Sequence, residues 1–235
     1  PITVESMRAV KPTVPITTSP RCKPIPMSMG ALPDAVALSA SADLLARLGR
    51  WKEHVATLER MLALTAELGE PQRRFRSVHV VGSNGKSSTA RMLAAIVEAH
   101  GLRSGAFLSP HLVSFPERVL VGGRDLDPAA FAASAARVRV AAEAVDAAQT
   151  GDARVTQFEA VTATAYDALA SAGVQVAAIE AGLGGRHDAT NVLDSEVQVL
   201  TSVGLEHTRW LGSTIEAIAA EKLAVVRDGA TLVVG

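Results

Sequence analysis

Cysteine is almost absent from this sequence of 235 residues, which contains Cys22 and no other. A single cysteine excludes an intrachain disulfide and is typical of proteins from a reducing compartment, so we expect a cytoplasmic protein. Long apolar runs are also missing. No stretch approaches the roughly 18–20 residues of a membrane span, and the N-terminus has no apolar core of a secretory signal. The sequence therefore predicts no membrane partner.

Aromatic residues make up only 3% of the chain, and the formal net charge is −1. A nucleic-acid binder usually has a basic block with interleaved aromatics, and this sequence has none. Hydrophobic residues form 48% of the chain, which is ample for the core of one large globular domain. We expect a monomer that acts on small molecules, with no nucleic-acid partner.

Proline is concentrated at one end, because seven of the 11 prolines lie within residues 1–33. Such density excludes regular structure, so we expect residues 1–33 to form a disordered or extended tail. The folded unit is then expected over residues 34–235. From about residue 41 to 68 leucines recur at helical spacing, which predicts packing helices, with partner binding as the alternative.

Short apolar runs alternate with helical patterns over the rest of the chain. The expected strands cover 78–81, 104–108, 119–121, 174–179, 197–202 and 231–234. The expected helices cover 89–97, with its apolar residues at 92, 93, 96 and 97, then 127–148 and 158–172, and one more that begins at a capping-box pattern, Ser213–Glu216. This alternation predicts an α/β fold with a doubly wound, mostly parallel sheet.

The strand over 78–81 runs into a loop of glycines and small polar residues, just before a helix begins. The loop reads Gly82-Ser83-Asn84-Gly85-Lys86-Ser87-Ser88. Backbone N–H groups at such a turn bind phosphates, Lys86 adds a positive charge, and Ser87 or Ser88 can offer a hydroxyl to Mg²⁺. The strict P-loop pattern has glycine where Val80 stands, so the loop is a shorter variant. A glycine turn that opens an ordinary helix is the alternative.

Ligands of doubly wound sheets bind beyond the carboxyl ends of the strands. Three polar groups besides the loop follow expected strands, namely Ser109, Glu180 and His207. Glu180 stands where a nucleoside triphosphatase has its Mg²⁺-binding carboxylate, and the histidine suggests a second site or a softer ion such as Mn²⁺. The alternatives are a solvated loop glutamate and a structural, hydrogen-bonded histidine.

Lys222 is unusual because Ile215, Ile218 and Lys222 fall on one face of the last expected helix. One interpretation is a lysine whose stem packs while its amine reaches water. The other is a desolvated lysine near a metal ion, with a lowered pKa and a reactive neutral amine.

These residues occur in ordered motifs, and the sequence resembles the ATP-dependent ligases of folate metabolism, dihydrofolate synthase and folylpolyglutamate synthase, within the Mur ligase superfamily. The resemblance runs from about residue 41 to 235. Besides the loop over 82–88, it rests on Ser109-Pro110-His111-Leu112, Phe115-Pro116-Glu117-Arg118, Phe158-Glu159, the run from Glu180 to Asn191, Glu206-His207, Leu211-Gly212 and Glu221-Lys222. It implies the central, P-loop ATPase domain of such a ligase, with the C-terminal ligase domain absent from this sequence.

The resemblance also implies roles for single residues. ATP would be bound by Gly82, Ser83, Asn84, Gly85, Lys86, Ser87, Ser88 and Asn191. Mg²⁺ and a second divalent cation would be held by Ser88, Ser109, Glu180, His207 and a carbamylated Lys222. The pteroate or folate substrate would contact Ser109, Pro110, His111, Phe115, Arg118 and Phe158, with core packing as the alternative for Phe158. The catalytic residues would be Lys86, His207 and Lys222.

The implied reaction joins L-glutamate to dihydropteroate or tetrahydrofolate through an acyl phosphate made with ATP. Because the missing domain helps to bind ATP and glutamate in this family, we expect weak nucleotide binding and little or no ligase activity from the 235 residues alone. Ser83, Ser87 and Glu206 depart from the family's usual threonine, glycine and aspartate, and Ser87 puts in doubt which serine meets the metal ion. The alternatives are another Mur-type ligase, a non-catalytic nucleotide-binding module and a small-molecule kinase.

Overall fold

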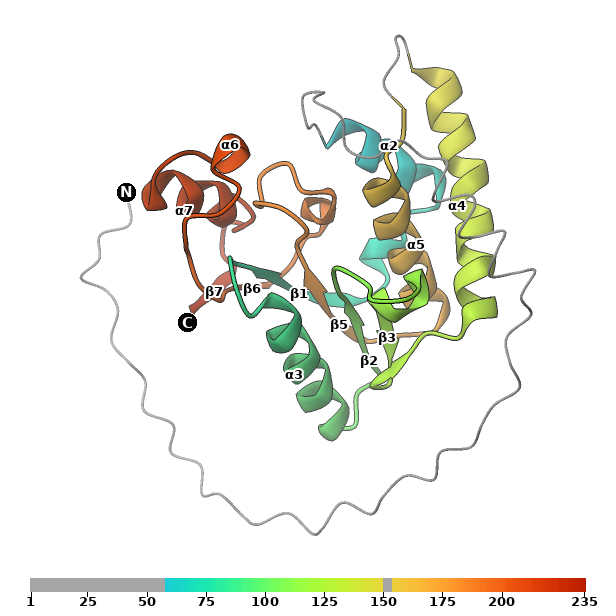
Figure 1. Ribbon diagram of the computed structural model, residues 1–235. Helices are drawn as coiled ribbons and strands as arrows, with labels where there is room; N and C mark the ends of the chain where they lie inside the picture. The colour runs from blue at the N-terminus through green and yellow to red at the C-terminus, as the bar shows by residue number, and fades with distance from the viewer. Residues whose placement is uncertain (1–57, 150–153) are drawn as a thin grey trace. The chain divides into compact units, whose positions relative to one another are not determined.

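A seven-stranded sheet organises the part of the chain that the computed structural model describes, residues 58–149 and 154–235 (Figure 1). The order of the strands is β4-β3-β2-β5-β1-β6-β7. The strands are β1 Arg76–Val81, β2 Ser104–Phe107, β3 Val119–Val121, β4 Arg124–Asp125, β5 Val176–Glu180, β6 Val197–Leu200 and β7 Thr231–Val234. The predicted α/β class is confirmed.

The sheet is mostly parallel, as predicted. β1 pairs in parallel with β5 and β6, β2 with β5, and β6 with β7. β3 runs antiparallel to β2, and β4 runs antiparallel to β3. β4 was not expected, because a strand of two residues leaves no hydrophobic period in the sequence. All five parallel strands end at the same edge, so the loops that follow them lie together.

Helices cover both faces of the sheet (Figure 1). α3 (Lys86–Ala99) lies on one face, where small side chains such as Ala90, Ala94 and Ala178 pack with Val80. α2 (Glu59–Glu67), α4 (Pro128–Ala148) and α5 (Gln157–Ser171) lie on the other face, over the larger core that contains Phe107, Phe131, Tyr166 and Ile179. Asp127 caps α4 through its carboxylate, as the Asp-Pro sequence predicts.

The buried residues of α3 are alanines and not its larger apolar residues. Met92 and Ile96 are 59% and 55% exposed, whereas Ala90 and Ala94 are buried. The helix expected over 89–97 is confirmed, although at least two of its large apolar residues lie in solvent. The two alanines form the contact because small side chains let the helix lie close to the strands, which leaves the outer apolar residues in solvent.

Short helices complete the described residues: η2 (Pro71–Arg73), η3 (Phe115–Arg118), η4 (Ala189–Val192), α6 (Thr208–Leu211) and α7 (Ile215–Leu223). The capping box expected at Ser213–Glu216 is wrong. α7 begins one residue later, with the Thr214 hydroxyl accepting from the Ala217 N–H, and the third helical position therefore has no carboxylate to return a hydrogen bond.

The tail over residues 1–33 and the helices expected over 41–57 lie outside the described residues and remain predictions, as does the division at residue 34. Within the described ranges, no helix is both long enough and apolar enough to cross a membrane.

Candidate functional site

The loop between β1 and α3 is braced by the segment that follows β6. The Ser83 N–H donates to the Ser202 carbonyl at 2.9 Å, and the Asn84 N–H donates to the Ser202 hydroxyl at 3.1 Å. In return, the Gly204 N–H donates to the Ser83 hydroxyl at 2.9 Å. The loop therefore has a fixed conformation, with the N-terminus of α3 and its unpaired N–H groups directly after it.

Gly82 is where the loop leaves β1, and no other residue fits there. Its φ is +148°, and a Cβ would lie 2.0 Å from the Thr201 hydroxyl oxygen. Its carbonyl accepts hydrogen bonds from two ammonium groups, those of Lys86 and Lys222, each at 2.9 Å. Two lysines from different helices thus converge on the loop, which favours negatively charged ligands here.

Lys222 faces inward, with 1% of its surface exposed, and its ammonium group also contacts Glu206 at 2.6 Å. The interpretation of an amine that reaches water is therefore wrong. Ile218 shares this buried face, but Ile215 is 41% exposed. Partial burial raises the pKa of Glu206, yet the hydrogen bond and charge of Lys222 outweigh it, so the pKa lies below its usual value.

The surroundings of Lys222 fit an ammonium group and do not fit a carbamate. Both of its partners, the Gly82 carbonyl and the Glu206 carboxylate, are acceptors. A carbamate at this position would put a second negative charge beside Glu206, while the Gly82 carbonyl would keep only its bond to Lys86. Carbamylation of Lys222 stays a prediction.

Glu180 ends β5 beside the loop and is only 2% exposed, so the solvated-loop interpretation is wrong. Its Oε1 accepts from the Ser87 hydroxyl at 2.9 Å, and its Oε2 accepts from the Ser109 N–H at 3.0 Å. Burial raises the pKa of Glu180, although these hydrogen bonds and the nearby charges of Lys86 and Arg118 act in the opposite direction. The carboxylate thus joins the loop over 82–88 to the segment after β2.

The oxygen atoms gathered at Glu180 are the ligand type that Mg²⁺ prefers. The Ser87 hydroxyl lies against the carboxylate, whereas Ser88 is exposed, so the geometry favours Ser87 over Ser88 as the hydroxyl ligand. His207 is also exposed, at the start of α6. Among the described residues, no group of three or more His, Cys, Asp or Glu side chains could hold a metal ion. A cation held by Glu180, His207 and serine hydroxyl groups stays a prediction.

Asn191 has a structural position rather than an open one. Its side-chain N–H donates to the Arg186 carbonyl at 2.9 Å, and its side-chain oxygen accepts from Arg227 at 2.9 Å. The residue is 5% exposed. The expected contact of Asn191 with nucleotide is not supported by these contacts, because both ends of its amide are already bonded within the chain.

The segment after β2 has the fixed shape that its two prolines predict. The Glu117 carboxylate accepts hydrogen bonds from the backbone N–H groups of Leu112, Val113 and Ser114. The first of these bonds contributes most, and together they lower the pKa of Glu117 to about 2. Leu112 and Val113 form the tip of the loop and are 92% and 89% exposed.

His111 and Phe115 both contact the Arg118 side chain. The centroids of their rings are 4.4 Å apart, and the Arg118 Nε–H donates to His111 Nδ1 at 2.8 Å. Burial, and then the charge of Arg118, lowers the pKa of His111. The guanidinium also lies 5.9 Å from the Phe115 ring centroid. These two residues therefore orient Arg118 instead of lining the cavity themselves.

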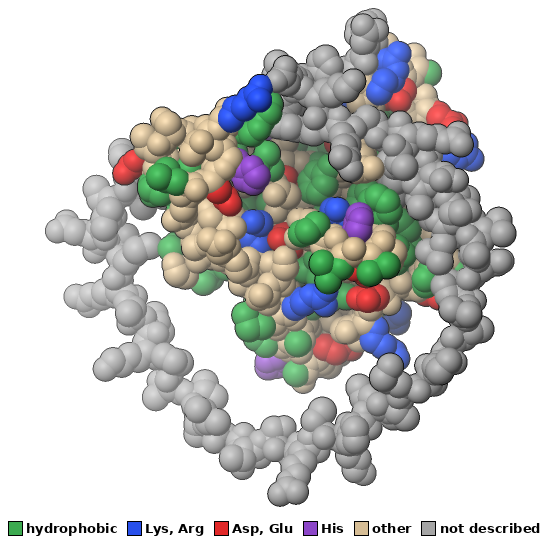
Figure 2. Space-filling view, in the orientation of Figure 1, with side chains coloured by type: hydrophobic (Ala, Val, Ile, Leu, Met, Phe, Trp, Pro, Cys, Tyr) green, Lys and Arg blue, Asp and Glu red, His purple; other side chains and the backbone are tan. Residues whose placement is uncertain are grey.

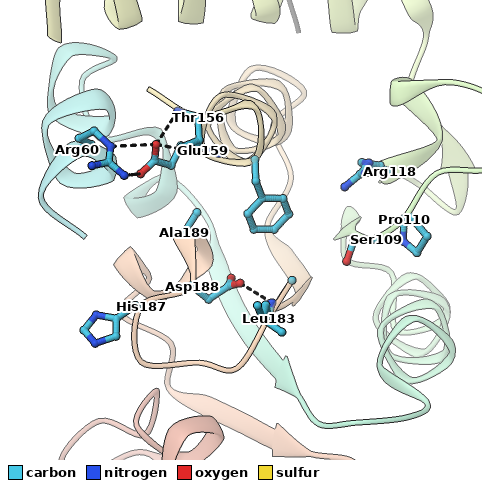
Figure 3. Close-up of a pocket in the computed structure, with 12 residues that line it drawn as sticks. Arg60, Ser109, Pro110, Arg118, Thr156, Glu159, Leu183, His187, Asp188 and Ala189 are labelled. Atoms are coloured by element: carbon cyan, nitrogen blue, oxygen red, sulfur yellow. Dashed lines mark hydrogen bonds and ion pairs between the residues drawn. The ribbon is translucent and has the colours of Figure 1, made fainter. Parts of the chain in front are cut away.

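A cavity of about 410 Å³ is lined in part by Ser109, the residue whose N–H bonds Glu180 (Figure 3). Four residues predicted to bind substrate line it: Ser109, Pro110, Arg118 and Phe158. The close-up places Ser109, Pro110 and Arg118 on one side, and Arg60 with Glu159 and Thr156 on another. The face of the molecule shown in Figure 2 has basic, acidic and hydrophobic side chains close together near its centre. The cavity suits a ligand with both apolar and charged parts.

The sequence did not identify the other lining residues, which are Arg60, Thr156, Glu159, Gly182, Leu183, His187, Asp188 and Ala189. Two signals were present: the Thr-x-x-Glu spacing of Thr156 and Glu159, which is a capping box at the start of α5, and the polar run after Glu180. Arg60 gave no signal. It reaches the cavity because it pairs with Glu159, at 3.1 Å, from another helix.

A phosphate-type loop between a parallel strand and a helix, with a buried carboxylate on the neighbouring strand, defines a P-loop nucleotide-binding α/β domain, consistent with the central domain of Mur ligases.

No protein-family model matches the chain. It is 40% identical over 184 residues to the dihydrofolate synthase/folylpolyglutamate synthase of Mycobacterium tuberculosis, covering 75% of this chain and 38% of that protein. The Escherichia coli protein of the same name is 40% identical over 178 residues, covering 76% and 40%. The solved structure of L. casei FPGS in its apo form aligns with a TM-score of 0.79 and 37% identity, covering 84% of this chain and 48% of that one. E. coli FolC in complex with DHPP and ADP aligns with a TM-score of 0.75 and 37% identity, covering 87% and 46%.

The chain is thus a homologue of the dihydrofolate synthase/folylpolyglutamate synthases. It spans about 40% of the length of the curated relatives it matches, which corresponds to one domain.

Proposed function

We propose that this chain is the nucleotide-binding domain of an ATP-dependent ligase that joins L-glutamate to dihydropteroate, tetrahydrofolate or both. The main support is the position of Glu180. One carboxylate oxygen contacts Ser87 of the phosphate loop, and the other contacts Ser109, which lines the cavity. Glu180 therefore connects the phosphate loop to a residue of the cavity wall, and a transfer from ATP to a bound acceptor requires the two sites to be neighbours.

The phosphates of ATP would lie on the N–H groups of the loop over 82–88 and of the first turn of α3. The Lys86 ammonium group donates to the carbonyls of Gly82 and Ser83, at 2.9 and 3.3 Å. When ATP is bound, it would donate to a phosphate oxygen instead. Glu180 and Ser87 would hold Mg²⁺, whose role is to neutralise charge on the transferring phosphoryl group.

The acceptor would occupy the cavity, with its rings against apolar groups such as Phe158, Pro110 and Leu183 and its carboxylate toward Arg118. The complex of E. coli FolC with DHPP and ADP supports two ligands of this kind. In the proposed reaction the acceptor carboxylate forms a bond to the γ-phosphorus, and the bond from that phosphorus to ADP breaks. The glutamate amine then bonds to the acyl carbon, releasing phosphate and a proton.

Nucleotide and acceptor binding by the 235-residue chain test this proposal. We expect ADP to bind in the presence of Mg²⁺, and Glu180→Gln to weaken that binding at least tenfold. Glu98→Gln is the matched control, because Glu98 is exposed near the far end of α3 and caps the Ser104 N–H. Calorimetry would measure ADP and dihydropteroate separately for each variant.

Equal ADP affinity in the parent and Glu180→Gln would contradict the proposed metal and phosphate site. Binding of ADP without binding of dihydropteroate or tetrahydrofolate would favour a nucleotide-binding module or another Mur-type ligase.

A further inference from the structure

A continuous chain of buried hydrogen bonds leads from the middle of β1 to the wall of the cavity. His79 Nε2 lies 2.8 Å from the Thr190 hydroxyl. Thr190 donates to Asp188 Oδ1 through its hydroxyl and, at 3.0 Å, through its N–H. Asp188 Oδ2 accepts the Leu183 N–H at 2.7 Å (Figure 3). His79 is 1% exposed, Thr190 is fully buried, and Asp188 is 6% exposed, so solvent does not compete for these bonds.

The direction of the hydrogen bonds follows from the protonation states. Burial, together with the charge of Arg227, lowers the pKa of His79 to about 3, so its imidazole is neutral. The Thr190 hydroxyl has one proton, which it gives to Asp188, and it must therefore accept a proton from His79 Nε2–H. Burial raises the pKa of Asp188, but hydrogen bonds from Thr190 and from the Gly182 and Leu183 backbone act against this. Asp188 thus acts as an acceptor for all of them.

Gly182 connects this chain of hydrogen bonds to the aromatic wall. A Cβ at Gly182 would lie 2.4 Å from Phe158 Cζ and 3.1 Å from Asp188 Oδ2. The Phe158 ring and the Asp188 carboxylate therefore both pack closely against Gly182, on the side where a Cβ would project. Any shift of Asp188 moves the Gly182-Leu183 backbone, and the Phe158 ring has to follow or lose contact.

We propose that His79 and Thr190 are positioning residues for the cavity. Through Asp188 they fix the Gly182-Leu183 backbone, and through that backbone they set the position of the Phe158 ring against which the acceptor lies. Neither residue lines the cavity itself. The identity of the acceptor rests on the proposed function, whereas the positioning role does not.

Thr190→Val tests the proposal, because it keeps the shape of the side chain and removes the hydroxyl. Thr162→Val is a matched control: Thr162 is also fully buried, but its hydroxyl has no hydrogen-bond partner among the described residues. Thr190→Ser restores the hydroxyl. The readouts are the hydrogen exchange rate of the Leu183 amide, and the affinities for dihydropteroate and for ADP. All are measured on the 235-residue chain.

We expect Thr190→Val to speed exchange at Leu183 and to weaken dihydropteroate binding about tenfold, with the ADP affinity unchanged. Thr190→Ser and Thr162→Val should behave like the parent. Unchanged exchange at Leu183 in Thr190→Val, or an equal loss of both affinities, would overturn the proposal. If the parent does not bind dihydropteroate, the proposed function fails, and the exchange data still decide the positioning role.

His79 provides a second pair of variants if Thr190→Val does not fold. His79→Gln keeps an N–H donor of similar reach, and His79→Leu removes it. Faster exchange at Leu183 in His79→Leu than in His79→Gln would support the proposal. Equal rates in the two variants would refute it.

Discussion

Replacing Lys222 by methionine removes a buried ammonium group while keeping a side chain of similar length. The ammonium group lies 2.9 Å from the Gly82 carbonyl and 2.6 Å from Glu206, and the residue is 1% exposed. The substitution therefore removes two hydrogen bonds, one of which is also an ion pair, that tie α7 to the phosphate loop and to the segment after β6.

The loss of stability depends on how well the two partners, Glu206 and the Gly82 carbonyl, are satisfied without the ammonium group. Removing one member of a fully buried ion pair costs about 3–5 kcal/mol, because the other charge is left unpaired. Here the Glu206 side chain keeps 25% of its surface exposed, and the Gly82 carbonyl keeps its bond to Lys86. Both remaining groups are partly satisfied, so we expect Lys222→Met to lower the free energy of unfolding by about 2–3 kcal/mol.

Urea unfolding followed by circular dichroism measures this change. With a slope of about 2–3 kcal/mol per molar urea, the midpoint should fall by about 1 M. Lys86→Met is the matched comparison, because Lys86 bonds the same carbonyl from a half-exposed position. It should change the free energy of unfolding by less than about 1 kcal/mol and should abolish most ADP binding. A loss below about 0.5 kcal/mol for Lys222→Met, or equal losses for the two variants, would refute the reasoning.

Two further predictions concern the loops. The pKa of Glu117 lies near 2, below its ordinary value, so the bonds from Leu112, Val113 and Ser114 should persist at neutral pH and be lost only as the pH falls through about 2. A ¹³C NMR titration of the Glu117 carboxyl group that gave a midpoint near 4 would contradict this. Gly82→Ala would place a Cβ 2.0 Å from the Thr201 hydroxyl oxygen, so the phosphate loop could not pack on Thr201. This variant should abolish ADP binding. Gly229→Ala is the control, because a Cβ there would have no atom within 4 Å, and it should leave ADP binding intact. Equal ADP affinity in both variants would show that the loop accommodates a Cβ at residue 82 and would contradict the prediction.

The residues at the strand ends could be predicted from the sequence because their positions depend on local pattern. A short apolar run predicts a buried strand, parallel strands end at one edge, and the loop over 82–88 and Glu180 follow such runs directly. The choice between Ser87 and Ser88 could not be made, since it depends on the orientation of the first turn of α3 toward β5.

The wall of the cavity depends on tertiary contacts and was largely missed. Arg60 lines it only because Glu159, 99 residues later, holds its guanidinium. Asp188 lines it because Thr190 and Leu183 hold its carboxylate. No period or motif in the sequence gives such distances between side chains. For the same reason the sequence could not show that His111 and Phe115 contact Arg118 and do not line the cavity.

Ser109 belongs to both halves of the site, since its N–H bonds Glu180 and its other atoms line the cavity. Any ligand that binds on one side and moves Ser109 changes the free energy of binding on the other side. Such an effect is thermodynamically reciprocal: if a bound acceptor changes the affinity for nucleotide by some factor, nucleotide changes the affinity for the acceptor by the same factor. One backbone amide therefore gives the two halves of the site a direct route for cooperativity.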